Sequence, residues 1–428
     1  MAEFSGKLAY KILQAINHER LTGTAGEAKA ARTFAKFFRS FGLKPKEETF
    51  KIDTYTDDKA WVEVLEPYKK KYEAAVWGMS GNTPKGGITV PFKYVENAQN
   101  CYLDDVKGKA VLIGGGVGIK KYEMLMSKGV KAIVSIGRPK QLHNRGRIPD
   151  TYRKKIGKLY GLNVLFDDAL EMVKKKASKV RIFLKQTEKR VDARNVIAEV
   201  KGTTHPDEII VIVAHYDSVS KSVGGHDNAA GSAIIAAIAR AVADKPMART
   251  IRFIEFSGEE FGLCGSQSYT KKHKKELEDI KLCINVDIAG PIFGHNRFYI
   301  SGPDQLKHDV ECMGKEFGME FMNPPDVYSS DNVSFSEYDI PAASIMRGGG
   351  YAMDGHTVKD GIEDVDADHL AITGNFVVEF LRRTANAIDF PFPREIPDDQ
   401  KKKIKNYLDR MRATDFKPKK KKGERKKK

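Results

Sequence analysis

Cysteine is scarce in this sequence, and long apolar segments are missing. The four cysteines show no C-x-x-C spacing, which excludes a zinc finger and favours reduced thiols over a disulfide framework; they are Cys101, Cys264, Cys283 and Cys312. The longest nearly apolar stretch, residues 233–243, is interrupted by Arg240 and is far shorter than the ~20 residues that span a bilayer. The first residues also lack the apolar core of a secretory signal. We therefore expect a cytoplasmic protein with no membrane partner.

The composition is that of a globular protein. The chain has 428 residues, of which 41% are hydrophobic and 30% charged, and this length predicts two or three domains. Its 37 glycines and 17 prolines are near the average, which excludes a collagen-like or wholly disordered chain. The net charge is +16, and residues 417–428 hold nine basic residues against one acidic residue, which is half of the excess. We interpret this tail as a solvated, disordered extension; attraction to nucleic acid or acidic partners is the alternative.

The pattern of apolar residues, glycine and proline divides the chain into three parts. Residues 7–42 place apolar side chains at helical spacing, which predicts N-terminal helices. Residues 62–187 contain short β-rich runs broken by glycine and proline, and we expect them to form a separate, smaller β-rich α+β domain inserted into the first one. Residues 396–428 form the basic extension. The main domain is therefore discontinuous and comprises residues 1–61 and 188–395.

Strands and helices alternate after residue 194. The runs IIVIVA and LCINV are almost continuously apolar, which is typical of central strands that are covered on both faces. We predict a three-layer α/β/α sandwich with a mostly parallel, mixed central sheet, and a closing helix over 368–385.

Polar residues follow the predicted strands, where ligands of open α/β sheets bind. IIVIVA runs into His215 and Asp217, TIRFIEFS into the pair Glu259–Glu260, and LCINV into Asp287. Asp227 lies in a glycine-rich turn before a helix, and His356 lies far downstream in DGHTVKD. Holding such charges together costs several kcal/mol per ion unless cations compensate them. Imidazole and carboxylate ligands without thiolate favour zinc, with cobalt or manganese as substitutes.

Five motifs in this order carry a resemblance. They are H-x-D at 215–217, G-x-D-N-x-x-G at 225–231, E-E at 259–260, Asp287, and H-T-x-x-D at 356–360. Together they resemble the family of co-catalytic zinc aminopeptidases, which includes bacterial leucyl aminopeptidases, aminopeptidase Y and the glutamate carboxypeptidases. The resemblance covers residues 190–390 and the N-terminal helices. Residues 62–187 resemble, more weakly, the protease-associated domain inserted in many members.

The resemblance implies a role for each motif residue. Asp227 would bridge two zinc ions, Glu260 and His356 would complete one site, and His215 and Asp287 the other. Glu259 would be the general base. Asp217 would hold the ring of His215 in its ligating tautomer. Asp360, in the last motif, has a less defined role.

Three further residues are candidates for contact with the substrate. Asp331 lies in SSDNVSF, which resembles a substrate-side loop of the family, although a turn or helix cap explains it equally well. Arg347 could face a substrate carboxylate. Many relatives place an aromatic residue directly before the last histidine, whereas this chain has Gly355 there, with Tyr351 four residues earlier. Tyr351 is therefore a candidate donor to the oxyanion.

The expected function is hydrolysis of N-terminal residues from peptides. The same scaffold also supports carboxypeptidases, deacylases and glutaminyl cyclases, so the fold does not fix the substrate. A non-enzymatic binding protein that uses its basic tail is the alternative from another class, but no ligand or base of the motif set is missing. A homo-oligomer is compatible with the sequence.

Overall fold

The computed structural model describes residues 4–139, 142–320, 327, 329–349 and 354–412, and its chain divides into two compact units. Unit 1 comprises residues 1–56, 144–146 and 188–405, and unit 2 comprises 57–143, 147–187 and the segment from 406 onward. The strands β1 (Lys46–Glu66) and β8 (Lys179–Val200) contribute residues to both units.

The N-terminal helices of unit 1 are α1 (Gly6–Ala15) and α2 (Ala25–Ser40), as the apolar spacing predicts. Ser5 begins α1 by accepting the N–H of Leu8 at 3.2 Å, and Thr24 accepts the N–H of Glu27 in the same way at α2. Their apolar stripes, which include Ile12 and Phe34, are fully buried.

The central sheet of unit 1 has the order β8–β10–β9–β11–β13–β12. Its four inner strands are parallel: β10 (Arg249–Phe256), β9 (His205–His215), β11 (Ile280–Val286) and β13 (Ala342–Gly348). The flanking strands β8 and β12 (His295–Ser301) are antiparallel to their neighbours. This confirms the predicted mixed, mostly parallel sheet.

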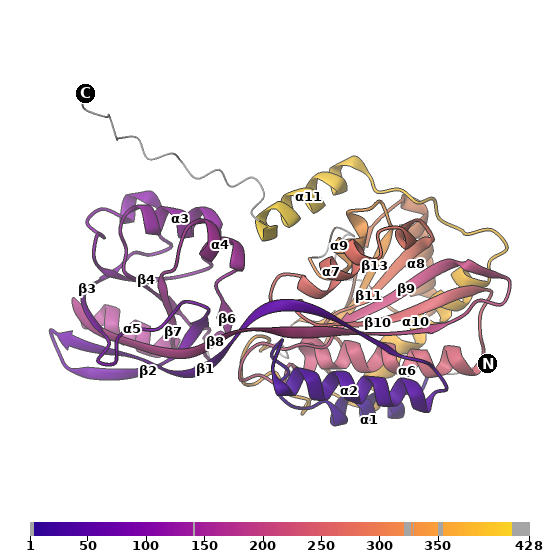
Figure 1. The fold of residues 1–428 in the computed structure, drawn as a ribbon, viewed down its shortest axis with the longest axis horizontal. Helices are drawn as coiled ribbons and strands as arrows, with labels where there is room; N and C mark the ends of the chain where they lie inside the picture. Colours follow the sequence, from indigo (N-terminus) through magenta and orange to yellow (C-terminus); the bar gives the residue numbers. More distant parts are fainter. Residues whose placement is uncertain (1–3, 140–141, 321–326, 328, 350–353, 413–428) are drawn as a thin grey trace. The chain divides into compact units, whose positions relative to one another are not determined.

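Helices cover both faces of this sheet (Figure 1). One core contains α1, α2, α6 (Ala230–Asp244), α8 (Asp304–Glu316) and α10 (Ala367–Asn386). The other contains α7 (Cys264–Lys272), α9 (Asn332–Ser336) and the short η3 (Glu276–Glu278). Alternate residues of β9 enter the two cores, because side chains alternate across a strand. Unit 1 is thus the predicted α/β/α sandwich.

Unit 2 has two apolar cores of its own. Its strand order is β1–β2–β7–β5–β4–β3–β8, and the inner pairs β7–β5, β5–β4 and β4–β3 are parallel. The strands are β2 (Lys70–Gly78), β3 (Ile88–Tyr94), β4 (Ala110–Ile113), β5 (Ala132–Ile136), the two-residue β6 (Gly146–Arg147), which pairs with β2, and β7 (Tyr160–Val164). The helices are η1 (Asn100–Tyr102), α3 (Ile119–Ser127), α4 (Asp150–Lys155) and α5 (Phe166–Lys174). Its identification as a protease-associated domain stays a prediction.

The predicted C-terminal extension begins with a helix. Residues 398–412 form α11 (Asp398–Arg412), whereas residues 413–428, which include the whole basic tail, lie outside the described residues. Within the described chain, no helix combines the length and the apolar character that crossing a membrane requires.

Candidate metal centre

The carboxyl ends of three neighbouring strands bring the predicted ligands together. His215 is the last residue of β9, Asp287 directly follows β11, and Glu260 lies four residues after β10. Because these strands are parallel, their ends meet at one edge of the sheet. Asp227 reaches the same edge from η2 (Gly225–Ala229), a turn that leads into α6.

The first group of candidate ligands consists of His215, Asp227 and Asp287, and one ligand atom of each lies within 4.8 Å of the others. Nε2 of His215 is 3.2 Å from Oδ1 of Asp227 and 3.3 Å from Oδ1 of Asp287. Two carboxylates therefore face the same ring nitrogen, which is the arrangement that a shared cation would stabilise.

The second group consists of Asp227, Glu260 and His356. Nε2 of His356 is 3.3 Å from Oδ2 of Asp227 and 3.0 Å from Oε2 of Glu260. Asp227 thus presents one carboxylate oxygen to each group, and it is the only residue that the two groups share. Each group offers three protein ligands, which is the number typical of catalytic zinc sites that keep an open position.

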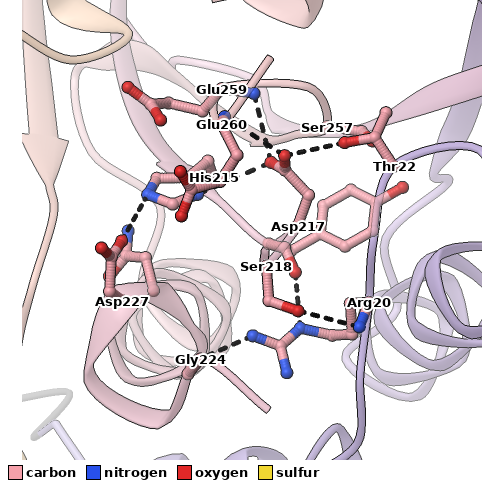
Figure 2. Close-up of polar contacts among 12 residues, drawn as sticks. Arg20, Thr22, His215, Asp217, Ser218, Gly224, Asp227, Ser257, Glu259 and Glu260 are labelled. Carbon is pink, nitrogen blue, oxygen red and sulfur yellow. Dashed lines mark hydrogen bonds and ion pairs between the residues drawn. The ribbon is translucent and has the colours of Figure 1, made fainter. Parts of the chain in front are cut away.

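Asp217 contacts the other side of the His215 ring (Figure 2). Its Oδ1 lies 3.5 Å from Nδ1 of His215 and accepts the backbone N–H of Glu259 at 3.2 Å. Its Oδ2 accepts the hydroxyl of Thr22 at 2.8 Å and the backbone N–H of Glu260 at 3.3 Å. Asp217 is therefore placed to orient the ring so that Nε2 faces the ligand group.

The turn that carries Asp227 is held by Asn228, the asparagine of the G-x-D-N-x-x-G motif, to which the sequence assigned no role. Its side chain donates to the carbonyl of Val286 at 2.8 Å and accepts the N–H of Gly231 and of Ile288, each at 3.1 Å. These bonds fasten the start of α6 to the end of β11. Asp227 and Asp287 are held close together as a result.

Asp360 joins the Asp227 turn to the loop of His356. Its Oδ1 accepts the N–H of His226 at 2.8 Å, and its carbonyl accepts the N–H of Gly225 at 2.9 Å. Gly225 is required here, because a Cβ at this position would lie 1.8 Å from the carbonyl oxygen of Gly361. The H-T-x-x-D motif therefore supplies a ligand candidate, His356, and, four residues later, Asp360, which binds the turn that carries Asp227.

Charges and burial perturb the titration of the centre. Burial opposes ionisation of Asp227, but hydrogen bonds with His215 and His356 outweigh it and lower the pKa of this carboxyl. The charge of Glu260 raises the pKa of His356 well above its ordinary value, although burial opposes the shift. Burial also raises the pKa of Glu259 well above its ordinary value. Glu259 belongs to neither ligand group.

The three predicted substrate contacts have different outcomes. Asp331 is fully buried at the start of α9, where burial raises its pKa to about 7, and its charge is one of those that raise the pKa of Glu259. Arg347 lies on β13, outside both ligand groups, and its guanidinium donates to three oxygens near β12: those of Pro291 (3.0 Å), Ile292 (3.0 Å) and the Asn296 side chain (3.1 Å). Three of its five N–H donors thus fix the segment around the start of β12. Tyr351 lies outside the described residues.

The donor set fits zinc. Two imidazoles and three carboxylates converge without a thiolate, and a buried oxygen of Glu260, Oε1, has no hydrogen-bond partner. Such a buried, unpaired carboxylate oxygen is costly unless a cation compensates it.

Known proteins resemble this chain in sequence and in fold. Residues 195–381, which hold all five candidate ligands, match the model of Peptidase family M28. The chain is 27% identical to Aminopeptidase YwaD of Bacillus subtilis over 391 residues, which cover 87% of this chain and 84% of that protein. It is 31% identical to Leucine aminopeptidase 2 of Trichophyton rubrum over 166 residues, 36% of this chain and 33% of that protein. The resemblance inferred from the motifs is thereby confirmed.

A solved structure shares the fold. BSAP, a zinc aminopeptidase from Bacillus subtilis, superimposes with a TM-score of 0.76 at 23% identity, covering 94% of this chain and all of that one.

Proposed function

We propose that this protein is a zinc-dependent aminopeptidase that removes N-terminal residues from peptides with two zinc ions. The observation that carries the proposal is the shared carboxylate of Asp227, whose two oxygens face two separate three-residue groups. The match to the M28 family, together with aminopeptidase relatives that include YwaD, supports the same reaction class.

His215, Asp227 and Asp287 would hold one zinc ion, and Asp227, Glu260 and His356 the other. When bound, such paired cations lower the pKa of a water molecule towards about 7 and polarise a carbonyl oxygen. The residues of this chain would then orient the zinc ligands and transfer the proton of the attacking water.

Glu259 is the proposed general base. Its backbone N–H donates to Asp217. Its neighbour Glu260 belongs to a ligand group, so Glu260 would bind zinc while Glu259 would transfer the proton. Burial raises the pKa of Glu259, which strengthens the carboxylate as a proton acceptor. Glu259 would take a proton from the attacking water and return it to the leaving amine.

The acidic side chains around the centre favour a substrate with a free amino terminus. Asp331 and Glu259 are carboxyl groups beyond the two ligand groups, and an ammonium group complements such a site. With Arg347 committed to other oxygens, no cation of the predicted set faces the centre to bind a substrate carboxylate. We therefore favour an aminopeptidase over a carboxypeptidase.

The test is a digest of a defined peptide, with free and with acetylated N-terminus, read by mass spectrometry. We expect stepwise loss of N-terminal residues from the free peptide only, no activity after chelation, and recovery with two zinc equivalents per chain. Removal of C-terminal residues from the acetylated peptide would instead identify a carboxypeptidase. A deacylase would release acetate from that peptide. Cyclisation of an N-terminal glutamine by a one-zinc protein would identify a cyclase.

Other properties belong to the same proposal. The cysteines are free thiols, in keeping with a reducing, cytoplasmic location that cell fractionation tests. We propose that unit 2 is a protease-associated domain that limits access to short peptides. The basic tail is proposed to leave peptide hydrolysis unaffected, and sedimentation would show whether the protein forms a homo-oligomer.

A further inference from the structure

Arg20 is a buried cation outside the two ligand groups. Its side chain is completely buried in the loop between α1 and α2, where an unpaired guanidinium would be strongly unfavourable. Burial lowers its pKa to about 10, while the charges of Asp360, Asp217 and Asp227 act in the opposite direction and favour its ionised form. The charges of the metal centre therefore favour a charged guanidinium at this buried position.

The guanidinium donates to backbone carbonyls of the two loops that carry His215 and Asp227. Nε donates to the carbonyl of Tyr216 at 2.5 Å, and Nη2 donates to that of Gly224 at 3.0 Å (Figure 2). Nη1 donates to the carbonyl of Val223. Tyr216 directly follows His215, and Gly224 lies three residues before Asp227.

The remaining contacts tie these loops to the N-terminal segment. Nη1 of Arg20 also donates to the carbonyls of Ile16 and His18, each at 2.9 Å. The backbone N–H of Arg20 donates to Oγ of Ser218 at 2.9 Å, and its carbonyl accepts the N–H of Ser218 at 3.3 Å. One residue thus joins the N-terminal segment to two neighbouring loops that follow it about 200 positions later in the chain.

We propose that Arg20 is a positioning residue for zinc binding, and that it sets the separation of His215 and Asp227 by holding the carbonyls of Tyr216, Val223 and Gly224 together. Only a planar guanidinium offers donors in these several directions at once, because the lysine ammonium is a compact group with three donors at one atom. The inference rests on the zinc centre proposed above and adds a residue that touches neither metal nor substrate.

The chain supplies a matched control in Arg249. Its side chain is equally buried, its Nε contacts Glu208 at 2.6 Å, and its Nη atoms donate to backbone carbonyls, including that of Ile388 at 3.3 Å. Arg249 is the first residue of β10, whereas the ligands gather beyond the other ends of the strands. Replacing it by lysine disturbs a comparable buried network away from the centre.

The experiment measures zinc affinity by chelator competition and thermal stability in the full chain with Arg20→Lys or Arg249→Lys. We expect Arg20→Lys to weaken zinc binding by about 10- to 100-fold, the usual effect of losing a group that orients metal ligands. Arg249→Lys should lower the melting temperature but leave zinc affinity within about threefold. A purely structural role for Arg20 would lower stability without this selective loss, and an unchanged affinity, or an equal loss in both variants, would overturn the inference.

A milder variant keeps the test decisive if Arg20→Lys does not fold. Ser218→Ala removes the acceptor of the Arg20 backbone N–H and should weaken zinc binding at least threefold; an unchanged affinity would then refute the positioning role. Zinc binding by the wild-type chain distinguishes a failure of the proposed function from a failure of the role proposed for Arg20. If wild type binds no zinc, the proposed function itself fails, whereas wild-type binding of two zinc ions with unaltered variants refutes only the role of Arg20.

Discussion

Asp217 accepts the backbone N–H of Glu259 at 3.2 Å with the same oxygen, Oδ1, that lies 3.5 Å from Nδ1 of His215. One carboxylate oxygen therefore contacts a candidate metal ligand and the backbone of the proposed base. Its other oxygen accepts the hydroxyl of Thr22, which anchors the arrangement in the N-terminal segment (Figure 2). The order of the site depends on a residue that does not itself belong to either ligand group.

Replacing Asp217 by asparagine should weaken zinc binding by about 10- to 100-fold and lower activity in parallel. The amide has one acceptor oxygen, so its NH₂ group must face at least one of the donors that Asp217 now satisfies. Chelator competition measures the affinity. Asp244→Asn, at a half-exposed ion pair with Arg240, is the control and should bind zinc like wild type. Equal affinities in all three proteins would contradict the orienting role.

Replacing Glu259 by glutamine should lower kcat by about 10² to 10⁴ while two zinc ions remain bound, because positioned proton transfer contributes a factor of this size. Steady-state kinetics and metal analysis of the same preparation provide the two readouts. Glu278→Gln changes an exposed carboxylate elsewhere and should retain full activity. An active, fully metallated Glu259→Gln variant would show that another group accepts the proton.

Replacing Asp227 and replacing Asp287 should reduce the number of bound zinc ions to different extents. Asp227→Ala removes a ligand from both groups, so both ions should bind weakly, whereas Asp287→Ala affects only the group of His215 and should leave about one zinc per chain. Metal content after dialysis against a dilute chelator distinguishes the variants. Two zinc ions retained by Asp227→Ala would exclude it as the bridge.

The buried carboxyl of Glu27 should make the stability of the folded protein depend on pH. Burial raises the pKa of its carboxyl above the ordinary value of 4.5, although the Tyr216 hydroxyl and the Arg194 N–H donate to it. The folded state binds the proton of Glu27 more tightly than the unfolded state does. The stability that this proton contributes to the folded state is therefore fully present below pH 4.5 and is lost as the pH rises through the raised pKa. Glu27→Gln, which keeps an acceptor oxygen, should remove that loss.

The free energy of unfolding of Glu27→Gln should therefore rise relative to wild type with increasing pH, by up to about 1.4 kcal/mol per pH unit. Urea unfolding at a series of pH values above 4.5 measures the difference. Glu311→Gln, at a partly exposed position, serves as the control and should run parallel to wild type. A constant difference between Glu27→Gln and wild type would show that Glu27 ionises alike in both states.

Much of the fold and of the centre could be predicted from the sequence. The apolar runs predicted β9 and β11, and the residues at their ends, His215 and Asp287, do lie together. Arg347 could not be judged in this way, because its partners are mainly backbone carbonyls of residues 291 and 292, which no side-chain pattern reveals. Arg20 was missed for the same reason. Its acceptors are carbonyls, and only the folded chain places them around one guanidinium.

The sequence alone indicated the N-terminal helices, the central strands β9 and β11 and the closing helix, since hydrophobic periodicity is local, and it marked the polar residues that end the apolar runs. Only the tertiary structure decided how those residues are grouped. Asp227 stands between His215 and His356 because parallel strands end at one edge of the sheet and because Asn228, Asp360 and Arg20 fasten distant loops to one another. Such contacts depend on distances between atoms remote in the chain, and these distances exist only once the core has packed.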